Sequence, residues 1–173
     1  MTENNVNKQT GEIVLREQVV QENDKYLVTQ LPDGTFRKQM KYEKYFTHIP
    51  QTQEDQILLY KVFNSSSENN DLVIPFGNMV GQVIGIDEFY QNPYESFDEK
   101  TGVTTPGVTT TIKDGESFYS TSSKSVYHTL RNLCDAFGYP NTADYKKIYV
   151  TVTGTKRNNG VQIDLALSHI GDK

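Results

Sequence analysis

Apolar and polar residues alternate most cleanly in two segments near the C-terminus, 147–153 and 161–167. In the first segment, the apolar residues at 148, 150 and 152 point to one side, and Tyr149 points to the other. Alternation with a period of two is typical of strands that bury one face. The residues between the segments, 154–160, begin and end with glycine, so we expect them to form the loop of a hairpin.

The pattern further upstream predicts three more strands and a helix. Met79–Phe89 is a long apolar segment in which Gly81 and Gly85 lie four residues apart, as in a strand that bends sharply around a barrel. Residues 107–112 and 117–121 flank a Lys-Asp-Gly-Glu sequence that favours a hairpin turn. Apolar residues at 126, 130, 133 and 137 share one face of a helix, which glycine at 138 and proline at 140 end.

These elements follow one another in the order β-β-β-α-β-β, which is typical of a five-stranded OB barrel. The sequence therefore predicts a mainly β protein with minor α content. Its OB barrel would cover residues 77–170, with one helix between the third and fourth strands. Residues 91–106 contain two prolines and charges of both signs, and we expect them to form a long loop after the first strand.

An N-terminal extension over residues 12–76 is expected to pack on this barrel. Residues 12–20 and 25–31 are apolar enough for strands, and the Pro-Asp-Gly-Thr sequence that follows them is typical of a turn. The next segment, 36–46, predicts either a strand paired with 25–31 or a short helix. Residues 1–11, rich in asparagine and threonine, are expected to form a flexible arm.

The clearest element of the extension is a helix over residues 53–63. Its acidic residues at 54 and 55 fall in the first turn, where the helix dipole favours them. Ile57, Leu58 and Tyr60 are expected to form its apolar face. The polar run 64–71 ends the helix and marks the boundary before the barrel.

The composition excludes several classes of protein. The chain carries 22 acidic and 17 basic residues, a net charge of −5 at pH 7, which argues against coating nucleic acid through bulk charge but not against local patches. Its single cysteine, Cys134, excludes a disulfide framework and a zinc site with several thiolates. The sequence contains no P-loop, zinc-protease or dinucleotide-binding motif, so we expect no enzyme, no cofactor and no metal site.

Targeting signals are also missing from the pattern. The N-terminal residues are polar and contain no apolar stretch of a secretory signal. No apolar run reaches the length of a transmembrane helix. We therefore expect a cytoplasmic protein.

Aromatic side chains interleaved with bases are the remaining candidate chemistry. The chain has 11 Tyr and 8 Phe, and aromatic rings stack on nucleobases at roughly 1–3 kcal/mol per base, while Lys and Arg hold phosphates. In an OB barrel, strands two and three and the loops joining strands one–two and four–five flank one binding face. The candidates on those elements are Tyr90, Tyr94, Phe97, Phe118, Tyr119, Tyr149, Lys156 and Arg157. One of Phe118 and Tyr119 must face the core, since they are neighbours on a strand.

A second basic and aromatic cluster lies in the N-terminal extension. Its residues are Phe36, Arg37, Lys38, Lys41, Tyr42 and Lys44. They form either a solvated face of a strand or helix that packs on the barrel, or an extension of a nucleic-acid path. The acidic pI near 5.2 favours an alternative for the whole protein, in which the barrel is a protein-interaction module and its exposed tyrosines form the interface.

Two long stretches of the chain resemble a known family. GVTTTIKDGESFYSTSSKSVYHTLRNLCDAFG (107–138), followed by KKIYVTVTGTKRNNGVQIDLALS, is similar to the single-stranded DNA-binding proteins of Gram-positive phages and conjugative plasmids. In that family a strand pair ends in an aromatic–Tyr–small–x–Ser–Lys run, which here spans Phe118–Lys124. The upstream sequence QILLYKVFN…IPFGNMVGQVIGI is also similar, so the resemblance covers roughly residues 53–168.

The resemblance implies an OB-fold protein that coats exposed single strands of DNA, or of RNA, without strong sequence preference during replication or DNA transfer. It implies Tyr119, Lys124 and Tyr149 as contacts of the strand. The chain ends in His-Ile-Gly-Asp-Lys, without the long glycine-rich linker and acidic tip of the housekeeping bacterial proteins. We therefore expect no recruitment of partners through a tail. Replication or transfer proteins are candidate partners, and the N-terminal extension is the candidate for homo-oligomerisation.

Overall fold

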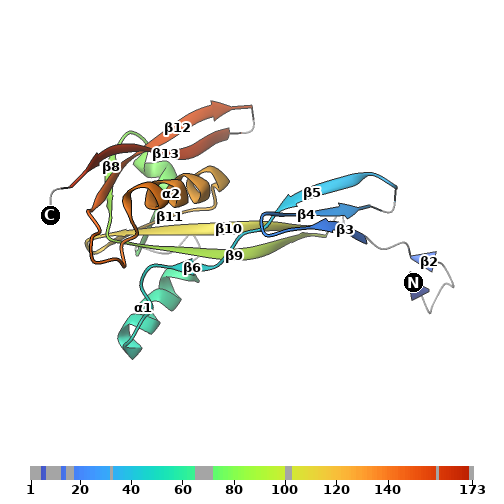
Figure 1. The fold of residues 1–173 in the computed structure, drawn as a ribbon, viewed down its shortest axis with the longest axis horizontal. Coiled ribbons are helices and arrows are strands. Elements are labelled where there is room, and N and C mark those ends of the chain that lie inside the picture. The colour runs from blue at the N-terminus through green and yellow to red at the C-terminus, as the bar shows by residue number, and fades with distance from the viewer. Residues whose placement is uncertain are drawn as a thin grey trace. The chain divides into compact units, whose positions relative to one another are not determined.

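The structure is a computed structural model that describes residues 5–6, 13–14, 18–31, 33–64, 72–99, 103–158 and 160–171. The described part is mainly β and contains two α-helices, as predicted (Figure 1). Contacts divide the chain into two compact units. The first comprises Met1–Tyr42 and Glu95–Pro106, and the second comprises Glu43–Tyr94 and Gly107–Lys173.

The first unit is built on an antiparallel sheet in the order β3-β4-β5. These strands are β3 (Gln18–Glu22), β4 (Tyr26–Gln30) and β5 (Phe36–Met40). The turn between β4 and β5 forms at the predicted place, because Asp33 accepts hydrogen bonds from the Thr35 backbone N–H at 2.9 Å and hydroxyl at 2.6 Å. Gly34 supplies the positive φ of 84° that the turn requires.

The strand alternative is therefore confirmed for the first part of segment 36–46, where β5 pairs with β4. Two short strands, β1 (Asn5–Val6) and β2 (Ile13–Val14), also pair with each other. The remaining residues of the predicted arm, 1–4 and 7–11, lie outside the described residues.

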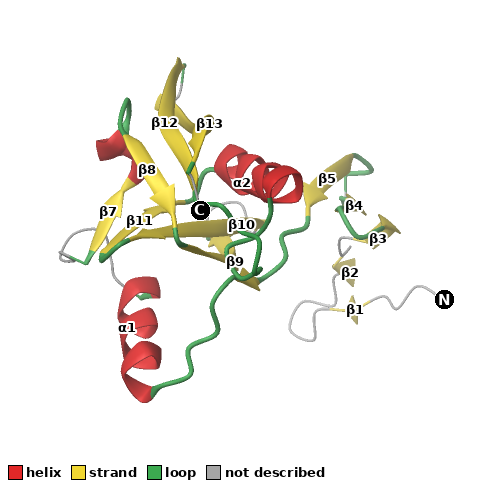
Figure 2. Ribbon diagram, turned by 60° about the vertical axis from the view of Figure 1, so that its left-hand side comes forward, coloured by secondary structure: helices red, strands yellow, loops and turns green. Residues whose placement is uncertain are grey.

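The second unit contains two sheets, and both can be followed in Figure 2. One has the order β6-β9-β10-β11-β7, with strands β6 (Tyr45–Phe46), β7 (Val73–Pro75), β9 (Glu88–Asp98), β10 (Val103–Asp114) and β11 (Ser117–Thr121). The other has the order β13-β12-β8, with β8 (Val83–Ile86), β12 (Ile148–Arg157) and β13 (Gly160–Ile170). The far ends of β9 and β10 belong to the first unit.

The two helices lie where the sequence predicted them. Helix α1 (Gln53–Phe63) starts at Thr52, whose hydroxyl accepts a hydrogen bond from the Asp55 N–H at 3.1 Å. Helix α2 (Lys124–Phe137) lies between β11 and β12 in the chain, and it ends at Gly138, which has a φ of 99°. A short 3-10 helix, η1 (Phe76–Met79), precedes β8.

Apolar side chains from both sheets and from α2 enclose one core. Ile86 of β8, Phe89 of β9, Ile112 of β10, Leu130 of α2 and Val150 of β12 are all buried in it. The described ladders are open sheets and do not close the five predicted barrel strands into a ring. The mainly β class is thus confirmed, whereas the closed OB barrel stays a prediction.

Helix α1 buries a different face from the predicted one. Leu59 and Val62 are buried, whereas Ile57 and Tyr60 are 48% and 69% exposed. The buried pair packs on the five-stranded sheet, in a second cluster with Tyr90 and Phe118. The sheet surface therefore selects the packed face, and the run of apolar residues in the helix does not reveal it.

The segment Met79–Phe89 is not one strand, contrary to the prediction. Met79 ends η1, Gly81 has a φ of 87° in the turn that follows, and β8 and β9 are separate strands in different sheets with Asp87 between them. The segment does bend sharply, as expected, but the bend at Asp87 divides it into two strands.

The long loop predicted for residues 91–106 is also wrong, because β9 continues to Asp98 and β10 begins at Val103. Pro93 is tolerated since β6 pairs with β9 only at Tyr90 and Gln91. The predicted loop 154–160 is likewise mostly strand, since β12 runs to Arg157 and β13 begins at Gly160.

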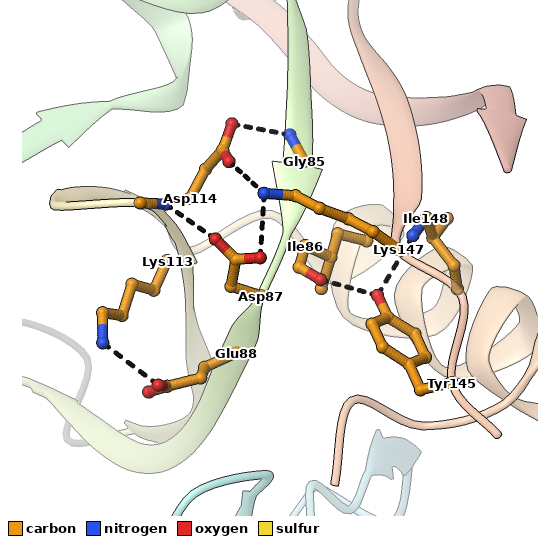
Figure 3. Close-up of polar contacts among 10 residues, drawn as sticks. Gly85, Ile86, Asp87, Glu88, Lys113, Asp114, Tyr145, Lys147 and Ile148 are labelled. Carbon is orange, nitrogen blue, oxygen red and sulfur yellow. Dashed lines mark hydrogen bonds and ion pairs between the residues drawn. The ribbon is translucent and has the colours of Figure 1, made fainter. Parts of the chain in front are cut away.

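A network of charges braces the bend between β8 and β9 (Figure 3). The Lys147 ammonium lies 2.8 Å from an oxygen of Asp87 and 2.7 Å from an oxygen of Asp114. The Gly85 N–H donates to the other Asp114 oxygen at 2.8 Å, and the Gly115 N–H donates to Asp87 at 2.7 Å. The two carboxylates thus tie β8, the β10–β11 turn and the start of β12 together.

The same contacts set the protonation of this network. Burial opposes ionisation of Asp87, but the hydrogen bonds from the Gly115 N–H and Lys147 outweigh it and lower the pKa of Asp87 below its ordinary value of 3.8. Burial also opposes the charged form of Lys147, an effect that by itself would lower its pKa. The hydrogen bonds of Lys147 with Asp114 and Asp87 outweigh burial and raise the pKa of Lys147 above its ordinary value. Both groups are therefore charged over the neutral pH range.

Gly85 is needed for this arrangement, because a Cβ at that position would overlap the Lys147 side chain where it crosses β8. We expect Gly85→Ala to displace the Lys147 ammonium from Asp87 and Asp114 and to lower the free energy of unfolding by about 1–3 kcal/mol, the usual cost of leaving partly buried polar groups without a partner. Urea denaturation measures this change. Gly77→Ala is the matched control, since no atom lies within 4 Å of its added Cβ, and we expect a change within about 0.5 kcal/mol. Equal effects of the two substitutions would contradict the role of Gly85.

The lowered pKa of Asp87 predicts a pH dependence of stability. Its ionised form contributes stability that is present above the ordinary value of 3.8 and is lost as pH falls through the folded-state pKa. We therefore expect Asp87→Asn to be less stable than the natural protein by a constant amount between about pH 5 and 8, and the gap to close in stronger acid. Denaturant titrations at stepped pH test this, and a gap that widens in acid would contradict it.

Candidate nucleic-acid interface

The five-stranded sheet presents two chemically different faces. One face carries Phe89 and Ile112 into the main core. The opposite face, which we call the outer face, carries Asn92 and Tyr94 of β9 and Ser120 of β11. The register supports this assignment, because Ile112 lies opposite Tyr119, and the next pair along the strands, Thr111 and Ser120, must point to the other side.

A groove of about 520 Å³ lies on the outer face. Helix α1 contributes Val62 and Phe63 to its lining, and β7 contributes Pro75. The strands contribute polar side chains and one aromatic side chain, namely Asn92, Tyr94, Thr109 and Ser120. The groove therefore combines an apolar wall with a row of hydroxyl and amide groups, which is the composition typical of small-ligand sites.

Tyr94 owes its position in this groove to a glycine on the neighbouring strand. A Cβ at Gly107 would overlap the Tyr94 ring, so the ring lies directly over the Gly107 backbone. Tyr94 is still 43% exposed. Tyr94 is a residue that the sequence pattern predicted, whereas Gly107 is not. The signal for Gly107 was a glycine within a strand pattern, where close approach of another group is a common cause.

Two other predicted contacts on this sheet are core residues. Tyr90 and Phe118 are only 1% and 4% exposed and pack against α1. Burial raises the pKa of Tyr90, whose hydroxyl donates a hydrogen bond to Glu88. Neither ring has a face open to a base in this structure, because α1 covers both.

Tyr119 also packs inward, on the opposite side of β11 from Phe118. Its ring is partly buried against the main core and meets Phe76 edge-on at a centroid distance of 6.4 Å. The prediction that one of Phe118 and Tyr119 faces the core is therefore confirmed. Tyr119 packs against the main core, and Phe118 lies in the second cluster, beside α1. Lys124, the next candidate along the chain, is exposed at the first residue of α2.

The predicted contacts on the last hairpin lie on the three-stranded sheet. The Tyr149 ring is partly buried and stacks on His169 at 4.3 Å with an interplanar angle of 6°. Lys156 and Arg157 are exposed near the tip, where the Arg157 Nε donates to Gln162 at 3.2 Å. None of these three residues lines the groove on the outer face.

The basic and aromatic cluster of the extension is divided between the two units. Phe36 and Lys38 are exposed on one side of β5, and the Lys38 ammonium lies 3.8 Å from the centre of the Tyr26 ring. Lys41 forms an ion pair with Glu22 at 2.5 Å. Lys44 belongs to the second unit and lies 4.8 Å from the Phe46 ring centre.

The other three candidates of the first unit differ in exposure. Arg37 and Tyr42 are partly buried, and Phe97, near the end of β9, is exposed. Phe36 and Phe97 are therefore the two candidate rings with most of their surface open in this unit.

The described residues do not meet the requirements of a metal site, a reactive thiol or a membrane-spanning helix. No group of three His, Cys, Asp or Glu side chains among them is arranged to hold a metal ion. Burial raises the pKa of the Cys134 thiol to about 12, which keeps it protonated. No helix in the described part is long and apolar enough to cross a membrane.

Comparison with known proteins gives one clear similarity. The chain is 30% identical over 155 residues to the single-stranded DNA-binding protein of Bacillus phage GA-1, and the match covers 87% of this chain and 89% of the relative. No family model matches the chain. No solved structure matches it either.

Proposed function

Because the chain belongs to the family of phage single-stranded DNA-binding proteins that includes the one from Bacillus phage GA-1, we propose that it binds single-stranded DNA. The observation that carries this proposal is the extent of the similarity, 87% of the chain. The protein would coat exposed strands without strong sequence preference during replication or DNA transfer, as a binding protein and not an enzyme. The alternative of a protein-interaction module has no comparable support.

We propose that aromatic stacking and local positive charge share the binding. Proteins of this kind combine rings that stack on successive bases with cations that follow the backbone. The net charge of −5 means that these cations must be concentrated in patches. Exposed Lys124, Lys156 and Arg157 of the second unit are the candidates for phosphate contacts.

We propose that the first unit supplies further contacts with single-stranded DNA. Phe36 and Lys38 project from the same exposed side of β5, which pairs a stacking ring with a cation. Phe97 offers a second open ring, and Lys41 a second cation beside Glu22. Arg37, Tyr42 and Lys44 belong to the same proposed set. Tyr149 is a candidate on the other sheet through its stack with His169.

An OB barrel is the fold that we propose for the second unit. Two observations support it. The bent segment β8–β9 pairs with β12 on one side and neighbours β10 on the other, as the first strand of such a barrel must. At the gap between β11 and β13, the Ser123 hydroxyl donates a hydrogen bond to the Ile163 carbonyl at 2.5 Å.

Further predictions concern the assembly, the partners, the origin and the location of the protein. Homo-oligomerisation through the N-terminal extension and contacts with replication or transfer proteins stay predictions. RNA binding, a plasmid origin and a Gram-positive host also go beyond what the phage relative supports. A role on replicating phage DNA would place the protein in the host cytoplasm.

Titration of fluorescein-labelled dT oligomers and of a matching duplex tests the function. We expect tighter binding to the single strand, and an affinity that falls with salt with a log–log slope of about −0.7 for each phosphate contact. Anisotropy at low and moderate salt measures both quantities. No binding of the single strand at micromolar protein and low salt would overturn the proposal.

The same titration distinguishes phosphate contacts from general charge. The double substitution Lys156→Ala with Arg157→Ala should weaken binding and reduce the salt slope by about 0.7 for each phosphate that the variant no longer neutralises. Lys146→Ala is the matched control, because Lys146 is exposed and lies outside the candidate set. If the salt slope falls by the same amount in the double variant and in Lys146→Ala, the tip of the β12–β13 hairpin is not part of the interface.

A further inference from the structure

We propose that the groove on the outer face is a subsite for one unstacked nucleobase of the bound strand, with Tyr94 as its stacking platform. This inference rests on the single-strand binding proposed above. It adds a defined pocket and a positioning residue, Gly107, that neither the family similarity nor the sequence pattern assigns.

The Tyr94 ring is held in a position that suits stacking. The ring lies against the backbone at Gly107, where any side chain would displace it. The contact is made by the hydroxyl end of the phenol, which lies on β10 at this point. Tyr94 is 43% exposed and is one of the residues that line the groove. A ring that is already held by such a contact and is still partly exposed loses little conformational freedom when a base stacks on it.

The charge of the groove lining favours a base over a phosphate. None of the lining residues in the described part of the chain is Lys, Arg, Asp or Glu. A phosphate would therefore meet no cation among these described residues, whereas a flat and largely apolar base would contact Val62, Phe63 and Pro75 on the wall. The groove volume of about 520 Å³ lies within the range of sites that enclose small ligands.

The polar edge of the groove can form hydrogen bonds with a base. Asn92 offers both amide donors and a carbonyl acceptor, and the hydroxyls of Thr109 and Ser120 can donate or accept. Groups of this kind can pair with the edge of any base, which suits binding without sequence preference. The hydrogen-bonding edge of a base in duplex DNA is already occupied by its partner. The groove therefore favours an unpaired base.

A comparison of two ligands isolates the base contact. The affinity of the full-length protein is measured for a dT oligomer and for an abasic strand of equal length. Tyr94→Leu removes the ring face and should weaken dT binding about 5- to 150-fold, the range that corresponds to stacking of one base. Binding of the abasic strand and the salt slope of dT binding should not change, since the substitution removes no cation.

Gly107→Ala tests whether the glycine acts through the ring. It should reproduce the loss of dT affinity although the tyrosine is still present, and the double variant should be no weaker than Tyr94→Leu alone. Tyr94→Phe keeps the ring and should bind as the natural protein does, which decides the case if Gly107→Ala does not fold. Tyr60→Leu is the matched control, because Tyr60 is 69% exposed on α1 and outside the groove lining.

The outcomes distinguish a failure of the proposed function from a failure of the proposed subsite. If the natural protein fails to bind the dT oligomer, the proposed function falls and the subsite falls with it. If the natural protein binds and a folded Tyr94→Leu variant binds dT equally well, the subsite is overturned and the function stands. The groove would then be free for another occupant, such as a protein segment. An equal decrease in affinity for dT and for the abasic strand would also overturn the subsite, because Tyr94 would not then act on a base.

Discussion

One segment of backbone, from Val83 to Tyr94, has to serve both sheets of the second unit. Its first part pairs with β12 and its second part neighbours β10, with a bend at Asp87. The bend leaves polar backbone groups and a charged side chain at the junction of two buried strands, and these need partners. Lys147, Asp114 and the Gly115 N–H supply them. The common core forms because this junction lets both sheets face it.

The junction also determines where a ligand can bind. Once one face of the five-stranded sheet is used for the common core, only the outer face is available to a second element. Helix α1 occupies part of that face and buries Tyr90 and Phe118. The part that α1 leaves open contains Tyr94 and the groove. Tyr90 and Tyr94 lie on the same face of one strand, and the position of α1 separates the packing role of Tyr90 from the binding role that we propose for Tyr94.

The sequence predicted the local elements well because their signals are local. The bounds of α1 follow from Thr52 and the acidic first turn, and the end of α2 follows from Gly138. The predictions from the sequence were wrong where packing between residues far apart in the chain decides the structure. Leu59 and Val62 face the sheet only because β9 and β11 present Tyr90 and Phe118 there. Residues 91–106 looked like a loop because Pro93 and Pro106 suggested one, but both prolines fit strands whose neighbours leave them unpaired on one side.

The central claim is that the single strand engages the outer face of the five-stranded sheet. Amide chemical shifts of ¹⁵N-labelled protein, followed by NMR during titration with a dT oligomer, test it most directly. The claim predicts the largest shifts at Asn92, Gly107, Thr109 and Ser120, and little change at Tyr60 on the exposed side of α1. Large shifts confined to other surfaces, with these four amides unchanged at saturation, would contradict it.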